Sequence, residues 1–171
     1  MNHYKDKILY VLTGEVKTGS NEEILKSSAI GSCIALVAYE PKLQIGGMAH
    51  IMLPGTAPEN TKYDKTRYAN NAVSDLIIKM KAKGAKVENI EFCVVGGANV
   101  LKKENDTIAQ NNIDGVLNLL KKQNFRIKAK SVGGTERRSA SLNIKTGKLD
   151  YTVGDGAEMI LWDFLVNSEK S

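Results

Sequence analysis

Two apolar runs around a short polar segment predict a β-hairpin early in the chain. Residues 34–39 and 45–53 flank residues 40–43. Pro41 within that segment has the φ angle that the second position of a type I turn requires. Both runs carry apolar residues at odd and even positions, which is typical of strands covered on both faces. We therefore expect this hairpin to form an inner layer of a multi-layer sandwich.

The same hairpin places a cysteine and a histidine together if Tyr39 pairs with Gln44 across the turn. Paired residue numbers in an antiparallel ladder have a constant sum, so this register sets Cys33 directly opposite His50. Cβ atoms of opposed residues lie about 4.5–5.5 Å apart, within reach of a thiol–imidazole pair. The register thus predicts a candidate nucleophile and its general base.

Periodicity farther along the chain predicts two helices among several strands. Apolar residues at helical spacing predict helices over about 69–84 and 106–123. The expected stripe of the second helix is Ile108, Ile113, Val116, Leu117 and Leu120. Shorter apolar runs predict strands at 8–12, 24–28, 90–95 and 125–132, and a hairpin of 142–144 with 149–153. Residues 18–21 are interpreted as a polar turn.

The apolar segment 157–166 contains the single tryptophan, Trp162. We expect it to form a last strand or a short helix packed on the core; an exposed surface for a partner protein is the alternative. No linker or internal repeat divides the chain, so residues 1–171 are interpreted as one domain with an apolar C-terminal extension at about 154–171.

Composition narrows the class of protein. A chain of 171 residues with 42% hydrophobic content is long enough to bury a core. The net charge of +5 comes from scattered lysines without a nucleic-acid motif, so we expect no nucleic-acid partner, while an acidic protein partner stays compatible. The apolar run 8–12 is too short for a signal peptide or a membrane span. We expect a cytoplasmic protein that does not insert into membranes.

Cysteine and histidine usage predicts neither disulfides nor metal sites. The two cysteines, Cys33 and Cys93, are far apart, and the two histidines are His3 and His50. Cys93 lies in a plain apolar run and is interpreted as a core residue, and His3 has no partner to suggest a role. Cys33 is compatible with a small buried apolar residue, but its place before a strand and near His50 favours a nucleophile whose thiol pKa the imidazole lowers.

Glycine pairs follow two of the predicted strands. Gly96 and Gly97 lack the spacing of a phosphate-binding loop and are expected to form a tight turn at the wall of the active-site cleft. Arg137 and Arg138, which follow the pair at 133–134, are compatible with a carboxylate site, with ordinary surface charge as the default interpretation.

Several of these segments together resemble the CheD family of chemoreceptor glutamine deamidases. The resemblance rests on Ala-Ile-Gly-Ser-Cys at 29–33, Gly-Gly-Met-Ala-His-Ile-Met-Leu-Pro at 46–54, Tyr-Ala-Asn at 68–70, Gly-Gly-Ala-Asn at 96–99, Val-Gly-Gly-Thr at 132–135 and Thr-Gly at 146–147. It spans about residues 9–153. It implies a three-layer α/β/β sandwich similar to the catalytic domain of cytotoxic necrotizing factor toxins.

The resemblance also implies an activity, partners and a catalytic triad. The activity is hydrolysis of glutamine side-chain amides to glutamate on the cytoplasmic helices of methyl-accepting chemotaxis receptors, without cofactor or metal. The implied partner is a CheC-type phosphatase of phosphorylated CheY. The family triad of cysteine, histidine and a threonine six residues before the cysteine corresponds to Cys33, His50 and Ser27, where serine keeps the hydroxyl. Asn70 stands where the family usually has aspartate, and the extension after Val153 is not part of the family pattern.

Two other functions use the same residues differently. In the first, the chain is a binding module that docks on a CheC-like phosphatase or on receptors and changes their signalling without turnover. In the second, the Cys33–His50 pair hydrolyses a small amide, which requires an enclosed pocket rather than an open cleft.

Overall fold

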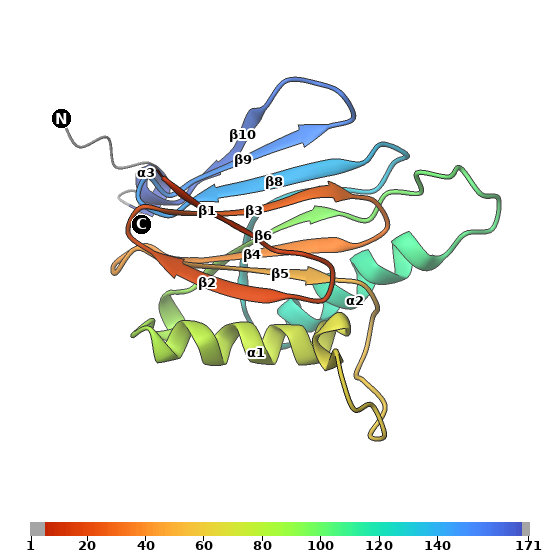
Figure 1. The fold of residues 1–171 in the computed structure, drawn as a ribbon, viewed down its shortest axis with the longest axis horizontal. Coiled ribbons are helices and arrows are strands. Elements are labelled where there is room, and N and C mark those ends of the chain that lie inside the picture. Colours follow the sequence, from red (N-terminus) through yellow and green to blue (C-terminus); the bar gives the residue numbers. More distant parts are fainter. Residues whose placement is uncertain (1–5, 169–171) are drawn as a thin grey trace.

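The computed structural model describes residues 6–168, which form two five-stranded sheets and three α-helices (Figure 1). His3 and the end of the C-terminal extension lie outside the described residues. One sheet, here sheet A, has the strand order β1 (Lys7–Tyr10), β3 (Glu23–Ile30), β8 (Arg138–Asn143), β9 (Lys148–Val153) and β10 (Met159–Asp163). The other, sheet B, has the order β2 (Val16–Ser20), β5 (Ile45–Ile51), β4 (Ile34–Glu40), β6 (Glu91–Gly96) and β7 (Arg126–Val132).

The helices and sheets form three layers, the arrangement that the family resemblance implies. Helices α1 (Ala69–Ala82) and α2 (Ile108–Lys122) cover one face of sheet B, and sheet A covers the other face (Figure 1). The remaining elements are α3 (Phe164–Ser168) and the short 3₁₀ turns η1 (Lys65–Arg67) and η2 (Val87–Asn89). Among residues 6–168, no helix is long and apolar enough to cross a membrane.

Alternation along β4 explains the layering, because successive side chains of a strand point to opposite faces. Ile34, Leu36 and Ala38 pack with α1 and α2 in one apolar core. Ala35, Val37 and Tyr39 pack with sheet A in a second core. All seven residues of β4 are buried, so the strand is the inner layer that its two-sided apolar pattern predicts.

The helices and most strands lie close to the predicted positions, with two corrections. Ile108, assigned to the apolar stripe of the second helix, is 55% exposed, and Asn112 is fully buried one turn later. Residues 18–20 are not a turn but the end of β2, paired with β5. Gly19 lies opposite Gly46 in that pairing, and a Cβ on Gly19 would press to 2.7 Å from Ile144 Cδ1, so the polar run suits a tightly packed edge strand.

The predicted hairpin forms, but its register is shifted by two residues from the predicted one. Tyr39 pairs with Gly46 rather than Gln44, and Ala35, not Cys33, pairs with His50. The strands extend to a Glu40–Ile45 pair because the Glu40 carboxylate accepts the backbone N–H of Lys42 at 2.9 Å and of Leu43 at 3.1 Å. Gln44 takes a left-handed φ of 53°, which closes the loop one residue later than predicted.

The C-terminal extension packs on the core, as the first of the two predictions for it states. It forms β10 and α3, which together cover the predicted apolar segment from residue 159 onward. Phe164 is fully buried, and its ring stacks on Tyr39 with 5.0 Å between ring centroids. Tyr39 also donates a 2.7 Å hydrogen bond from its hydroxyl to the carbonyl of Ile144, which joins the two sheets.

Candidate active site

The three residues suggested by the sequence gather where one end of sheet A meets sheet B. Ser27 lies on β3 of sheet A, and His50 lies on β5 of sheet B. Cys33 directly precedes β4 and packs against the core between the sheets. Ser27 and His50 are 1% and 5% exposed, whereas Cys33 is half-buried. The site is therefore assembled by the packing of two sheets rather than by one hairpin.

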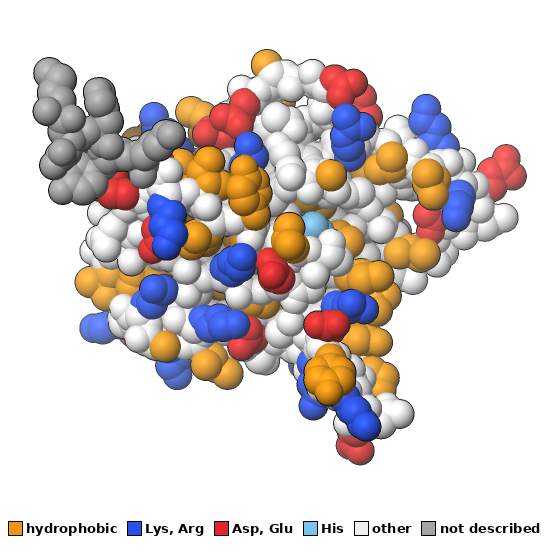
Figure 2. Space-filling model, viewed as in Figure 1, with side chains coloured by type: hydrophobic (Ala, Val, Ile, Leu, Met, Phe, Trp, Pro, Cys, Tyr) orange, Lys and Arg blue, Asp and Glu red, His pale blue; other side chains and the backbone are white. Residues whose placement is uncertain are grey.

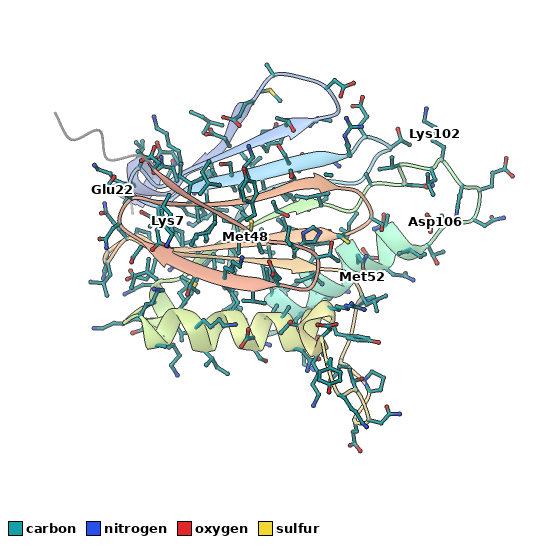
Figure 3. All side chains as sticks on the ribbon, in the orientation of Figure 1. Lys7, Glu22, Met48, Met52, Lys102 and Asp106 are labelled. Carbon is teal, nitrogen blue, oxygen red and sulfur yellow. The ribbon has the colours of Figure 1, made fainter. Side chains whose placement is uncertain are left out.

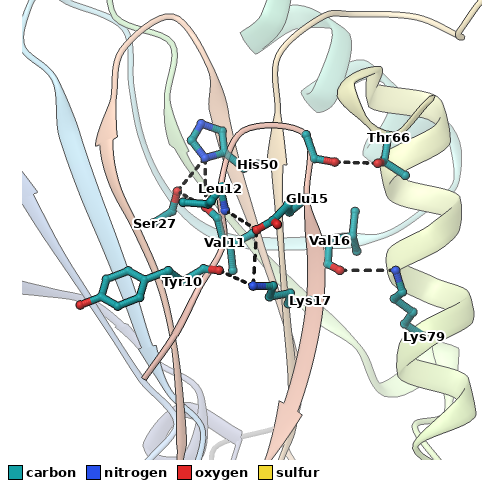
Figure 4. A network of polar contacts seen from close by, with 11 residues as sticks. Tyr10, Val11, Leu12, Glu15, Val16, Lys17, Ser27, His50, Thr66 and Lys79 are labelled. Carbon is teal, nitrogen blue, oxygen red and sulfur yellow. Dashed lines mark hydrogen bonds and ion pairs between the residues drawn. The ribbon is translucent and has the colours of Figure 1, made fainter. Parts of the chain in front are cut away.

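Ser27 and a backbone carbonyl hold one edge of the His50 ring (Figure 4). Ser27 Oγ lies 2.8 Å from His50 Nδ1, and the Val11 carbonyl oxygen lies 3.2 Å from the same nitrogen. Ser27 also donates a hydrogen bond of 3.1 Å to that carbonyl. The second ring nitrogen, Nε2, points away from this network in Figure 4.

These three contacts select one tautomer of the imidazole. The Val11 carbonyl can only accept, so it is satisfied by Ser27 and His50 together only if both donate. Nδ1 then carries the proton, and Ser27 accepts from the ring while it donates to Val11. In the neutral ring, Nε2 is consequently left with a free lone pair, which is the state of a general base.

The loop between β1 and β2 wraps around the His50 backbone. Gly14 donates its N–H to the His50 carbonyl at 2.8 Å, and His50 donates its N–H to the Glu15 carbonyl at 3.0 Å. The Glu15 carboxylate accepts the N–H of Leu12 at 2.8 Å, which closes the loop on itself. This hydrogen bond, with a smaller contribution from Lys17, lowers the pKa of Glu15. These hydrogen bonds hold the Val11 carbonyl next to Nδ1 of the ring.

Backbone hydrogen bonds hold Cys33 from the opposite side. Gly97 donates its N–H to the Cys33 carbonyl, and Ala98 donates to the Gly31 carbonyl, each at 2.9 Å. Gly96, at φ 123°, approaches so closely that a Cβ on it would overlap the Cys33 carbonyl oxygen. The glycine pair at 96–97 lies beside the candidate nucleophile as predicted, but it does not form a tight turn, because Gly96 is the last paired residue of β6.

Cys33 and His50 share a face of sheet B but are not opposed. Because Ala35 is the partner of His50, Cys33 is its diagonal neighbour on the same face, at a Cα separation of about 7–8 Å. Within residues 6–168, no hydrogen bond joins the Cys33 thiol to the imidazole. Side-chain rotation or substrate binding has to close the remaining gap, as is common for catalytic hydrogen bonds in unliganded enzymes.

Burial sets the protonation states of the pair, and it acts against the prediction of a low thiol pKa. Desolvation raises the pKa of the Cys33 thiol above its ordinary value. Desolvation also lowers the pKa of His50, although the hydrogen bond to Val11 and the charge of Glu15 oppose this shift. At neutral pH the site therefore holds a thiol and a neutral imidazole, so that proton transfer accompanies nucleophilic attack.

A surface pocket of about 390 Å³ opens beside His50. It is lined by Tyr10, Val11, Leu12, Thr13, Lys26, Ser28, Ala29 and His50. Ala29 lies in a bulge of β3. Its left-handed φ of 58° costs an alanine about 1–2 kcal/mol. Bulges of this kind redirect strands next to functional sites. In Figure 2, a small patch in the pale blue of histidine is visible among orange apolar side chains.

Several exposed apolar side chains are grouped around the site and form its rim. Leu12 is 62% exposed and lines the pocket beside His50. Met52, 38% exposed, follows β5, and its label in Figure 3 lies near α2. Val100, 39% exposed, lies 3.5 Å from the position that a Cβ on Gly31 would take. Exposed apolar groups around a reactive centre are typical of sites that receive another macromolecule.

Asn112 is a site residue that the sequence analysis missed. From α2 it donates hydrogen bonds of 2.8 Å to the Ser32 carbonyl and 3.0 Å to the Met52 carbonyl. These carbonyls precede Cys33 and follow His50, so the side chain ties together the two strand ends of the site. A signal was present, because position 112 is four residues from Ile108 and from Val116 on the predicted helix and is nevertheless polar.

The remaining candidates have other places in the structure. Cys93 is fully buried in the core between the sheets, and burial raises its pKa to about 12. In the described part of the chain, no three potential metal-ligating side chains lie close enough to hold an ion. Arg138 is buried at the start of β8 and lines a different pocket from that of His50.

Comparison with known proteins identifies the family of the chain. Residues 52–152 match the family model "CheD chemotactic sensory transduction". A protein of Chlorobium luteolum named probable chemoreceptor glutamine deamidase CheD is 40% identical, over 91% of this chain and 78% of its own length. Chemoreceptor glutamine deamidase CheD of Thermotoga maritima is 34% identical, over 86% of this chain and 92% of its own. The chain belongs to the CheD family.

Proposed function

We propose that the protein is a protein-glutamine glutaminase that converts glutamine side chains of chemotaxis receptors to glutamate. The observation that carries this proposal is the Ser27–His50–Val11 network, which leaves His50 Nε2 as a base on the face where Cys33 lies. The names of the CheD relatives support glutamine amides of chemoreceptors as the substrate. Chemotaxis receptors present these amides in the cytoplasm, which is where we place the activity.

In the proposed reaction, Cys33 Sγ attacks the δ-carbonyl carbon of the glutamine while His50 Nε2 accepts the thiol proton. The imidazolium then donates this proton to the departing nitrogen, so that ammonia is released and a thioester forms on Cys33. His50 next takes a proton from water as the hydroxide attacks the thioester. The C–S bond then breaks, the Cys33 thiolate regains a proton from the imidazolium, and the new carboxylic acid ionises to glutamate. Ser27 and Val11 stabilise the imidazolium through Nδ1. The backbone N–H groups near Ser32 and Cys33 are the candidate oxyanion donors.

An open pocket with an apolar rim favours a folded protein substrate over a small amide. We assign the deamidase domain to the whole chain, because the C-terminal extension packs on the same core. The likeness to cytotoxic necrotizing factor toxins and the binding of a CheC-type phosphatase stay predictions from the sequence resemblance. A non-catalytic binding role would leave signalling intact in a Cys33→Ala strain.

The direct test incubates the protein with a receptor cytoplasmic fragment and follows the conversion of glutamine to glutamate by peptide mass, at about +1 Da per site. We expect conversion by the natural sequence and by Cys93→Ala, and none by Cys33→Ala or His50→Ala. Conversion by Cys33→Ala at the rate of the unchanged protein would refute the proposal, and so would the lack of conversion by the unchanged protein.

A further inference from the structure

A second pocket lies across one loop from Cys33. It has a volume of about 530 Å³ and is lined by the loop after β6, the turn between β7 and β8, and the end of β9. The loop after β6 connects it to the site, since Ala98 binds the Gly31 carbonyl and the next residue, Asn99, donates its N–H to the Gly134 carbonyl at 2.9 Å. Lys102, which lines this pocket, is labelled in Figure 3 at the same end of the molecule as Met52.

A buried arginine lines this pocket. Arg138 is 9% exposed; its Nε donates to Ser131 Oγ at 2.8 Å and its Nη1 to the Gly133 carbonyl at 2.7 Å. Its Nη2 has no hydrogen-bond partner among residues 6–168, and no carboxylate of these residues forms an ion pair with it. A buried charge without an ion-pair partner is costly. Desolvation lowers the pKa of this guanidinium, and the charges of Tyr151 and Glu136 oppose that shift without forming an ion pair with it. The Nη2 group therefore stays available for a carboxylate ligand.

The surroundings leave room for such a partner. Gly133 and Gly134 both have left-handed φ angles, and no atom lies within 4 Å of the position that a Cβ would take on either. Lys102 and Arg137 add positive charge at the pocket, which also contains two acidic side chains. Of these, Asp155 is bound to Arg137 at 2.9 Å, and Glu136 lies against Gly154. The charged side chains that line the pocket have a net charge of +1, and Arg138 is the buried cation among them.

We propose that this pocket is a second substrate subsite, which binds a carboxylate of an acidic side chain on the receptor while Cys33 acts on a nearby glutamine. The inference rests on the proposed deamidase function and adds a rule of substrate choice to it. A guanidinium whose Nη2 amino group is free and whose other nitrogens are held in place binds a planar carboxylate through short, charge-assisted hydrogen bonds. A glutamine with an acidic neighbour would then be converted in preference to one without.

The test compares two substrates and three variants. One substrate is a receptor cytoplasmic fragment, and the other is the same fragment with the acidic residues around each converted glutamine replaced by alanine. On the first, we expect Arg138→Met to lower kcat/KM about tenfold, mainly through KM, because a charge-assisted hydrogen bond is lost. On the second, it should change kcat/KM less than about twofold. Arg138→Lys should keep part of the preference, and Arg126→Met, at the exposed start of β7 and outside the pocket, is the matched control that should leave it unchanged.

If Arg138→Met lowers kcat/KM equally on both substrates, Arg138 only supports the fold. If the unchanged protein has the same kcat/KM on both, the protein does not recognise a carboxylate next to the glutamine. Either result overturns the subsite. A measurement without turnover separates this failure from that of the proposed function. Titration with glutarate should shift the amide NMR signals of Gly133 and Gly134 saturably, and Arg138→Met should abolish the shifts. If the unchanged protein shows no saturable shift, the pocket binds no carboxylate, whether or not glutamine is converted.

Discussion

A backbone carbonyl, that of Val11, decides where the proton on His50 lies. Ser27 could either donate to or accept from the imidazole, and only the carbonyl, which cannot donate, removes this ambiguity. The hydroxyl then acts as a relay that accepts from Nδ1 and donates to Val11. A serine or a threonine can fill this role, because both carry a hydroxyl on Cβ.

Replacing Ser27 tests this relay. Ser27→Ala removes the 2.8 Å contact to Nδ1 and leaves only the longer contact to Val11. We expect kcat to fall about tenfold, in line with the loss of one buried hydrogen bond of about 1–1.5 kcal/mol. Ser27→Thr retains the hydroxyl and should stay within about threefold of the unchanged protein. Deamidation rates at saturating receptor fragment provide the measurement, and an equally slow Ser27→Thr would argue against the relay.

The protonation state of Cys33 predicts how its reactivity depends on pH. The thiolate is the reactive form, and burial raises the pKa of this thiol. The rate of alkylation by iodoacetamide should therefore keep rising as the pH increases beyond the ordinary cysteine value, without a plateau near pH 7. Cys93 is fully buried and should react more slowly at every pH. Peptide mass spectrometry distinguishes the two, and a plateau near neutral pH would mean that His50 already stabilises the thiolate.

Between elements, one side chain of α2 connects the strand ends that carry the site. Asn112 donates to carbonyls beside Cys33 and beyond His50, and its own Oδ1 is buried without a hydrogen-bond partner among the residues that the structure describes. The two carbonyls fix the orientation of the amide, because a flipped side chain would place its oxygen against theirs. Helix α2 thus contributes to the geometry of the site without contacting the reacting groups.

An isosteric substitution tests this connection. Asn112→Asp keeps the shape but replaces two donors with a buried negative charge that faces two carbonyl oxygens. We expect the free energy of unfolding at pH 7 to fall by about 3 kcal/mol and to recover partly at low pH, where the carboxyl regains a proton. The adjacent and exposed Asn111→Asp is the control and should change stability by less than about 0.5 kcal/mol. Urea unfolding at two pH values decides, and equal stability of both variants would contradict the role.

Elements with strong side-chain patterns were predictable from the sequence. The stripe that begins at Ala69 defines α1, and the two-sided apolar pattern of β4 identifies the inner layer. The register of the hairpin was not predictable, because it depends on the Glu40 carboxylate and on the left-handed backbone of Gln44. Neither feature can be recognised from the alternation of apolar and polar residues, so the sequence pattern is equally compatible with the neighbouring register.

The candidate site was predictable only in part, for the same reason. Cys33 and His50 stand out as reactive side chains on apolar strands, and Ser27 was identified through the family resemblance rather than through any pattern of its own. The carbonyl of Val11 leaves no trace in the sequence, since every residue carries one. The contact between β3 and β5 that brings Ser27 to His50 joins different sheets, and strand periodicity does not specify how sheets pack.

At the scale of the molecule, the site depends on the packing of sheet A against sheet B. Ser27 comes from one sheet and His50 from the other, so any loss of packing between the sheets separates them. Tyr39 anchors this interface through its hydrogen bond to Ile144 and its ring contact with Phe164. The C-terminal extension therefore supports the site from the far end of the shared core.

This dependence predicts that a substitution in the C-terminal extension weakens the whole fold. Phe164→Ala empties a fully buried position on the Tyr39 ring and should lower the free energy of unfolding by about 3–5 kcal/mol. Val166→Ala, two residues away and 55% exposed, should change it by less than about 0.5 kcal/mol. Because one cooperative core links the extension to the site, urea should abolish deamidation and circular dichroism at the same, lowered midpoint in Phe164→Ala. Activity that persists after the sheets unfold, or a Phe164→Ala protein as stable as Val166→Ala, would show that the extension is an appendage and not part of the core.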